Sequence, residues 1–134
     1  MKFRYKTYGS ILRPVIPITI RNGTRETDYS VLIDSGADFC LFHEQIGESV
    51  GIAIREGTPR EVTGVGGKST VYFRHSIEIM IGKYSHKIEA GFMPTITGRM
   101  MQYGLVGQRG FFEHFIVKFD LAEEEIELRQ RKDV

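Results

Sequence analysis

Short strand-like segments separated by glycine-marked turns dominate this chain, and they constrain its fold more than any other feature. Residues 15–20 are rich in β-branched side chains, Asn22 and Gly23 follow, and residues 29–33 are apolar again. An Asn-Gly pair between two such runs favours a two-residue hairpin turn, because turns of this kind need a positive φ. Turn residues recur along the chain, which has 15 glycines and four prolines among its 134 residues. The sequence therefore predicts a mainly β protein.

Further strands and hairpins are predicted downstream. Residues 61–73 place a glycine cluster between two strand-like arms, and residues 77–81 and 86–92 alternate apolar and polar side chains around a turn at residues 82–83. Additional strands are expected at 103–107, 116–120 and 126–129, and short helices at 43–50, with Gly51 as the C-cap, and at 111–115. This pattern predicts an all-β fold with one or two short helices, closed or partly closed into a barrel, as a single domain over residues 1–134.

The charge pattern and the hydropathy exclude several classes of protein. The net charge is +1 at pH 7 and the lysines and arginines are scattered, so the basic stripe of a nucleic-acid-binding protein is missing. No uncharged apolar run approaches the roughly 18 residues that a membrane helix needs. The charged N-terminus is not followed by the apolar segment of a signal peptide. We expect a soluble, cytoplasmic protein without nucleic-acid or membrane partners.

The residue types that most often bind metals lack the spacing for it. Cys40 is the single cysteine, and its neighbours Phe39, Leu41 and Phe42 indicate a small side chain buried in the core. The four histidines show no His-Glu-x-x-His spacing and have no partner cysteines. The sequence therefore predicts neither a metal site nor a cofactor.

One segment joins an apolar run directly to polar residues. Residues 31–33 lead into the sequence Asp-Ser-Gly-Ala-Asp at residues 34–38. An ionised carboxylate at the inner end of a buried strand is costly to desolvate, so Asp34 indicates a chemical role. The triplet Asp-Ser-Gly is by itself a common turn sequence. Two later elements favour the chemical interpretation, the glycine cluster at 64–67 and the Leu-Val-Gly run at 105–107.

In this order and at these spacings, the three elements resemble those of the retropepsin family, the single-domain aspartic proteases of retroviral type and their cellular and bacterial relatives. The resemblance extends from Val15 to about Phe119. It implies a small closed β-barrel of the acid protease type. It also implies an aspartic endopeptidase that acts on peptides or proteins without a cofactor.

The resemblance assigns roles to particular residues. It implies that Asp34 is the catalytic acid and that Ser35 and Gly36 form its supporting turn. It implies that Ala37 and Asp38 bind the substrate. The glycine-rich hairpin is expected to close over the substrate as a flap, whose tip consists of Gly64, Val65, Gly66 and Gly67.

A homodimer is the expected assembly. Aspartic proteases use two carboxylates that share one proton, and this chain holds one Asp-Ser-Gly sequence with no second half of similar size. A two-fold axis supplies the second carboxylate as a copy of Asp34 from the partner subunit. We therefore expect the monomer to be inactive.

The chain departs from the viral pattern in two places, and alternatives to the protease remain. Viral enzymes usually carry Gly-Arg-Asn where this chain has Gly-Gln-Arg at residues 107–109, so the arginine expected to pair with Asp38 is replaced or displaced by one position. The hairpin at 116–129 resembles that of the bacterial relatives, so the dimer interface need not copy the interleaved termini of viral enzymes. One alternative is a catalytically silent member of the fold that binds peptides or dimerises. Another is a metal-dependent hydrolase built on Asp34 and Asp38.

Overall fold

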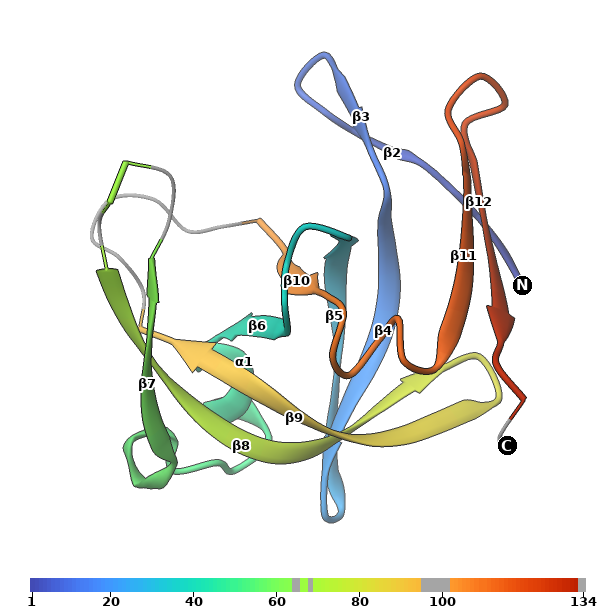
Figure 1. Cartoon of the computed structure of the whole chain (residues 1–134). Helices are drawn as coiled ribbons and strands as arrows, with labels where there is room; N and C mark the ends of the chain where they lie inside the picture. The colour runs from blue at the N-terminus through green and yellow to red at the C-terminus, as the bar shows by residue number, and fades with distance from the viewer. Residues whose placement is uncertain (64–65, 68, 95–101, 133–134) are drawn as a thin grey trace.

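The structure, a computed structural model, describes residues 1–63, 66–67, 69–94 and 102–132 (Figure 1). Strands dominate the described residues, as the sequence predicted. The elements in chain order are β1 (Lys2–Arg4), β2 (Lys6–Tyr8), β3 (Ile11–Arg13), β4 (Val15–Asn22), β5 (Arg25–Ile33), β6 (Cys40–His43), α1 (Glu44–Ser49), a 3-10 turn (Ile54–Glu56), β7 (Thr58–Thr63), β8 (Ser69–Ile81), β9 (Tyr84–Met93), β10 (Gly104–Val106), β11 (Phe115–Asp120) and β12 (Glu125–Gln130).

Six of these strands close into a barrel. The hydrogen-bonded order β4-β5-β10-β6-β9-β8 returns to its start because β8 also pairs with β4, and β7 extends the sheet beyond β8. The closing register places Ile20 opposite Ile79, and both side chains are fully buried. Alternate residues of a strand face the same side, so the isoleucines at every second position of β4 and β8 fill the barrel. The predicted closed all-β barrel is confirmed.

Two hairpins form at the turn residues that the sequence indicated, and in one of them the turn is shifted by one residue. Between β4 and β5, Asn22 pairs with Arg25, so Gly23 and Thr24 form the turn, one residue later than predicted. Gly23 has a φ of 63°, and a glycine in the first of two turn positions is a standard hairpin arrangement. The β8–β9 turn at residues 82–83 lies where the sequence predicted it, with Ile81 opposite Tyr84.

One of the two predicted helices is present. Helix α1 forms within the predicted residues 43–50, but its C-cap is Val50 and not Gly51 as predicted; Gly51 follows the cap with a φ of 84°, a conformation that glycine adopts readily. The predicted helix at 111–115 is wrong. The Phe115 N–H does donate to the Phe111 oxygen at 3.0 Å, but Phe115 already pairs with Gln130 in the β11–β12 ladder, so the segment is a single turn. Among the described residues, no helix has the length and apolar character needed to cross a membrane.

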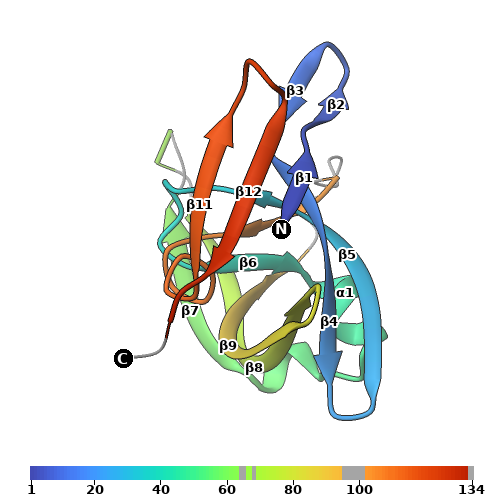
Figure 2. The ribbon, with the colours of Figure 1, turned by 90° about the vertical axis from the view of Figure 1, so that its right-hand side faces the viewer.

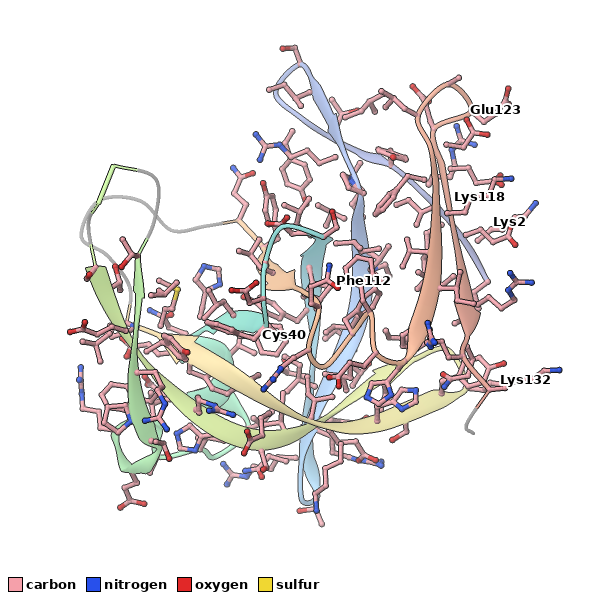
Figure 3. The ribbon with its side chains drawn as sticks, viewed as in Figure 1. Lys2, Cys40, Phe112, Lys118, Glu123 and Lys132 are labelled. Carbon is pink, nitrogen blue, oxygen red and sulfur yellow. The ribbon has the colours of Figure 1, made fainter. Side chains whose placement is uncertain are left out.

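The first 13 residues form strands that the sequence analysis did not predict. β1 pairs with β12 of the same chain, which makes a three-stranded sheet of β1, β12 and β11, and β2 pairs with β3 as a hairpin. Figure 2 shows these two groups side by side above one end of the barrel. Figure 3 shows Cys40 within the barrel and the exposed Lys118 and Glu123 on the β11–β12 hairpin.

Candidate active site

Asp34 lies where two parallel strands of the barrel end together. β5 and β10 pair in parallel with Ile33 opposite Val106, and the Asp34 backbone N–H donates to the Val106 oxygen at 3.0 Å. Val31 and Ile33 are buried in the core, whereas Asp34 is half-buried. The apolar strand therefore delivers the carboxylate to the end of the barrel, where water and other molecules reach it.

A tight turn after β5 orients the Asp34 side chain. The Gly36 N–H donates to Asp34 Oδ1 at 2.9 Å, and the Ala37 N–H donates to the Asp34 main-chain oxygen at 3.1 Å. A Cβ atom at residue 36 would lie 3.3 Å from Asp34 Oδ1, so glycine leaves this contact undisturbed. Ser35 and Gly36 are exposed. The turn therefore fixes one carboxylate oxygen and presents its own backbone to the surface.

The loop that follows β10 crosses directly over this turn at Gly107. A Cβ atom at residue 107 would overlap the main-chain oxygen of Ala37 and lie 2.7 Å from that of Phe39. Real Cβ atoms do not approach backbone oxygens this closely, because the overlap is repulsive. Glycine is therefore required where the two loops cross, which accounts for the third element of the sequence pattern.

Gln108 and Arg109 hold the loop after β10 against the Asp34 turn through hydrogen bonds to backbone oxygens of that turn. The Gln108 N–H donates to the Ala37 oxygen at 2.8 Å, and the Arg109 N–H donates to the Asp38 oxygen at 2.9 Å. The Gln108 side chain donates through Nε2 to the Ser35 oxygen at 2.7 Å. In the part of the chain that the structure describes, no ion pair includes Asp38. Gln108 thus uses a neutral hydrogen bond where the viral pattern has an arginine.

The glycine-rich hairpin is the β7–β8 ribbon, with Thr63 opposite Ser69. It projects from the barrel on the side where the turn after β5 lies, and both views agree on this (Figures 1 and 2). Gly66 and Gly67 are exposed and have φ values of 97° and 80°, which only glycine adopts readily. The predicted tip residues Gly64 and Val65 lie outside the described residues.

Cys40 is buried close to this site. Cys40 is buried as predicted, its Sγ donates to the Arg109 oxygen at 3.4 Å, and burial raises the pKa of its thiol to about 11. A thiol with this pKa is not a thiolate at neutral pH, so Cys40 is a packing residue. Over the described ranges, no three His, Cys, Asp or Glu side chains group closely enough to hold a metal ion.

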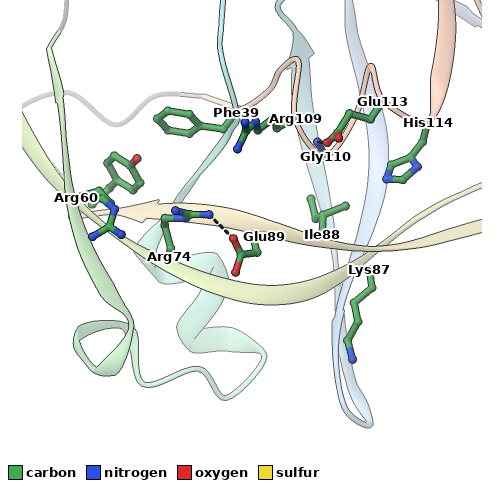
Figure 4. Close-up of a pocket in the computed structure, with 11 residues that line it drawn as sticks. Phe39, Arg60, Arg74, Lys87, Ile88, Glu89, Arg109, Gly110, Glu113 and His114 are labelled. Carbon is green, nitrogen blue, oxygen red and sulfur yellow. Dashed lines mark hydrogen bonds and ion pairs between the residues drawn. The ribbon is translucent and has the colours of Figure 1, made fainter.

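Next to this site lies a pocket of about 620 Å³ that the sequence did not reveal. Asp34 is not among the residues that line this pocket. The pocket lies between β7, β8 and β9 on one side and the loop after β10 on the other (Figure 4). Its cationic residues come from positions 60, 74, 87 and 109. These positions are far apart in the sequence and share no spacing, so no sequence pattern could reveal the pocket.

A sequence model of the family described as aspartyl protease matches residues 16–109. The chain belongs to the aspartyl protease family. The match includes the Asp34 turn, the glycine-rich hairpin and the crossing at Gly107. Among curated proteins, no relative matches this aspartyl protease family member significantly.

Solved structures with the same fold are retropepsin-like. One is a retropepsin-like aspartic protease from Rickettsia conorii, with a TM-score of 0.68 and 13% identity, covering 96% of this chain and 89% of that one. Another is the EIAV protease complexed with the inhibitor HBY-793, with a TM-score of 0.51 and 20% identity, covering 77% of this chain and 88% of that one. At these identities the likeness shows the fold, and the retropepsin type of barrel is confirmed for this aspartyl protease family member.

Proposed function

We propose that this protein is an aspartic endopeptidase whose active site forms between two copies of the chain. The observation that carries the proposal is the single oriented carboxylate of Asp34, held at Oδ1 by the Gly36 N–H on an exposed turn. The chain contains one Asp-Ser-Gly sequence. Because hydrolysis of this type needs two carboxylates, a second copy of the exposed turn has to face the first.

The proposed chemistry follows from the pairing of like charges. Two carboxylates about 3 Å apart cannot both ionise, so the pair holds one proton between them. The ionised carboxyl takes a proton from a water molecule, and that water attacks the carbonyl carbon of the peptide bond. The protonated carboxyl gives its proton to the carbonyl oxygen. The tetrahedral intermediate then breaks its C–N bond. The leaving nitrogen takes a proton from the carboxyl that had accepted one from water, and one hydroxyl of the intermediate returns its proton to the other carboxylate, so the dyad again holds one proton.

The proposed roles of the flanking residues rest on their positions. The exposed backbone at Gly36 leaves space for an extended peptide to pair as an added strand, with Ala37 and Asp38 next along the same loop. The β7–β8 hairpin would cover that peptide as a flap and exclude water when it closes, and the positive φ of Gly66 and Gly67 suits a tip that changes conformation.

A peptide-library cleavage assay between about pH 3 and pH 7 tests the proposal, because the shared proton makes the dyad most effective in acid. Wild-type protein is compared with Asp34→Asn and with Asp28→Asn as a matched control. Asp28 also lies on β5 but is exposed, and its Oδ1 accepts a hydrogen bond from Thr19, which an asparagine can still accept. We expect cleavage by the wild type and Asp28→Asn, and none by Asp34→Asn.

Two outcomes would overturn the proposal. Cleavage by Asp34→Asn would remove the dyad from the mechanism. Absence of cleavage by a folded wild-type dimer would leave the chain as a silent peptide-binding or dimerisation module. Sedimentation alongside the assay establishes the oligomeric state, and a strictly monomeric enzyme that still cleaves would contradict the shared site.

A further inference from the structure

The loops that form the candidate active site also form one wall of the neighbouring pocket. Phe39, which lines the pocket, directly follows Asp38, and the Arg109 N–H donates to the Asp38 oxygen at 2.9 Å. On the opposite wall, Arg60 of β7 pairs in register with Tyr72 of β8. These are the strands of the hairpin proposed as the flap. The pocket therefore adjoins the loop at residues 34–38, and a peptide bound along that loop, as proposed above, would extend toward it.

The charge of the pocket is unbalanced. Four cationic side chains line it, against two carboxylates. One carboxylate, Glu89, is already paired with Arg74, and the other, Glu113, accepts a hydrogen bond from the Gly110 N–H at 2.7 Å. Within the described residues, neither Arg60 nor Arg109 has a carboxylate within ion-pair distance.

The two unbalanced arginines flank an aromatic wall. The rings of Phe39 and Tyr72 lie 5.0 Å apart at 31°, and Figure 4 shows the Arg109 guanidinium beside Phe39 and Arg60 across from it. Tyr72 is 5% exposed and rests on Gly91, where a Cβ atom would lie 2.5 Å from the tyrosine ring. The wall is thus fixed by packing. An apolar surface beside a cation reduces screening by water and strengthens its attraction for an anion.

We propose that this pocket binds an acidic side chain of the peptide substrate, at a position away from the bond that is cut. A guanidinium group matches a carboxylate with two parallel N–H···O bonds, and Arg60 and Arg109 are the groups that supply them. That the bound peptide is a substrate rests on the proposed function. The recognition of an acidic peptide itself depends only on the pocket.

A binding experiment on Asp34→Asn tests the pocket without cleavage. The probes are a fluorescein-labelled decapeptide of alternating Glu and Ala and its counterpart with Gln in place of Glu, titrated by fluorescence anisotropy. We expect the Glu peptide to bind about 10-fold more tightly, as charge-assisted hydrogen bonds predict. Adding Arg60→Gln and Arg109→Gln should remove the difference. Adding Arg131→Gln, at an exposed position outside the pocket, should preserve it.

The outcomes separate the pocket from the proposed function. Equal binding of the two peptides, or a difference that survives the loss of both arginines, would overturn the pocket assignment. The cleavage assay is scored in parallel for Glu or Asp at each position around the cut. Cleavage with no acidic preference would also overturn the pocket assignment but would leave the proposed protease function standing. Selective binding of the Glu peptide without cleavage by the wild type would overturn the proposed protease function and leave the pocket assignment standing.

Discussion

The Gln108 side chain donates from Nε2 to the main-chain oxygen of Ser35 at 2.7 Å, joining residues 73 positions apart in the sequence. It ties the loop after β10 to the turn that carries Asp34. We expect Gln108→Ala to lower the free energy of unfolding by about 0.5–1 kcal/mol, the usual net worth of one hydrogen bond. Because the turn positions the carboxylate, kcat/KM for peptide cleavage should fall about 10-fold. Urea unfolding and steady-state kinetics measure the two effects.

Gln102→Ala provides the control for that substitution, since Gln102 is exposed and lies before β10. It should leave stability and kinetics within error of the wild type. Equal kinetics for Gln108→Ala and the wild type would show that the bond does not position the turn.

Gly107 and Gly36 should respond differently to the same added methyl group. At residue 107 the Cβ atom would meet backbone oxygens, including that of Phe39 at 2.7 Å, and backbone cannot move aside cheaply. At residue 36 it would meet one oxygen of the Asp34 side chain at 3.3 Å. We expect Gly107→Ala to cost about 2–3 kcal/mol and Gly36→Ala less than about 1 kcal/mol. Thermal or urea unfolding measures both costs, and equal values would contradict the described crossing of the two loops.

Mixed dimers provide a direct test of a shared active site. Wild-type and Asp34→Asn chains are unfolded together in equal amounts and refolded, so that about one quarter of the dimers carry two wild-type chains if pairing is random. Because a heterodimer lacks one carboxylate, activity should fall to about one quarter of that of the same total chain concentration of wild type. Activity of one half would mean that each chain works alone. A mixture with Asp28→Asn should keep full activity.

Stability should decline as the pH falls below neutrality because of His43. Burial lowers the pKa of His43, its Nδ1 lies 2.6 Å from the Tyr29 hydroxyl, and its Nε2 is buried without a partner among the described residues. The folded pKa is below the unfolded value of about 6.5, so this stability is complete above that value and is lost as the pH falls through the folded pKa. Urea unfolding from pH 7 down to pH 5 should show the decline.

The substitution His43→Asn isolates this effect, since the asparagine oxygen can accept from Tyr29 but does not gain a proton. The variant should be less stable than the wild type at pH 7 and should lose less stability toward pH 5. Parallel pH profiles for the two proteins would assign the decline to other groups.

The strands were predictable where alternation or a glycine marked them. The β4–β5 and β8–β9 hairpins follow directly from β-branched runs and from the turns that contain Gly23 and Gly82. The segment 111–115 was misread because its apolar residues suit a helix, whereas Phe115 is held by pairing with Gln130 of β12. That pairing partner is distant in sequence, and local preference does not reveal it. The same reason hid the pairing of β1 with β12.

Local signals were enough to predict the barrel class, the family and the placement of Asp34 at the end of an apolar strand, because period-two alternation, glycine turns and a short motif can each be recognised within a few residues. Tertiary structure decided what holds that residue in place. Only the fold brings Gly107 across the Asp34 turn, turns Gln108 toward Ser35, and gathers Arg60 and Arg109 around Phe39 and Tyr72. These contacts join positions that share no local pattern, since strand pairing and barrel closure alone bring them together.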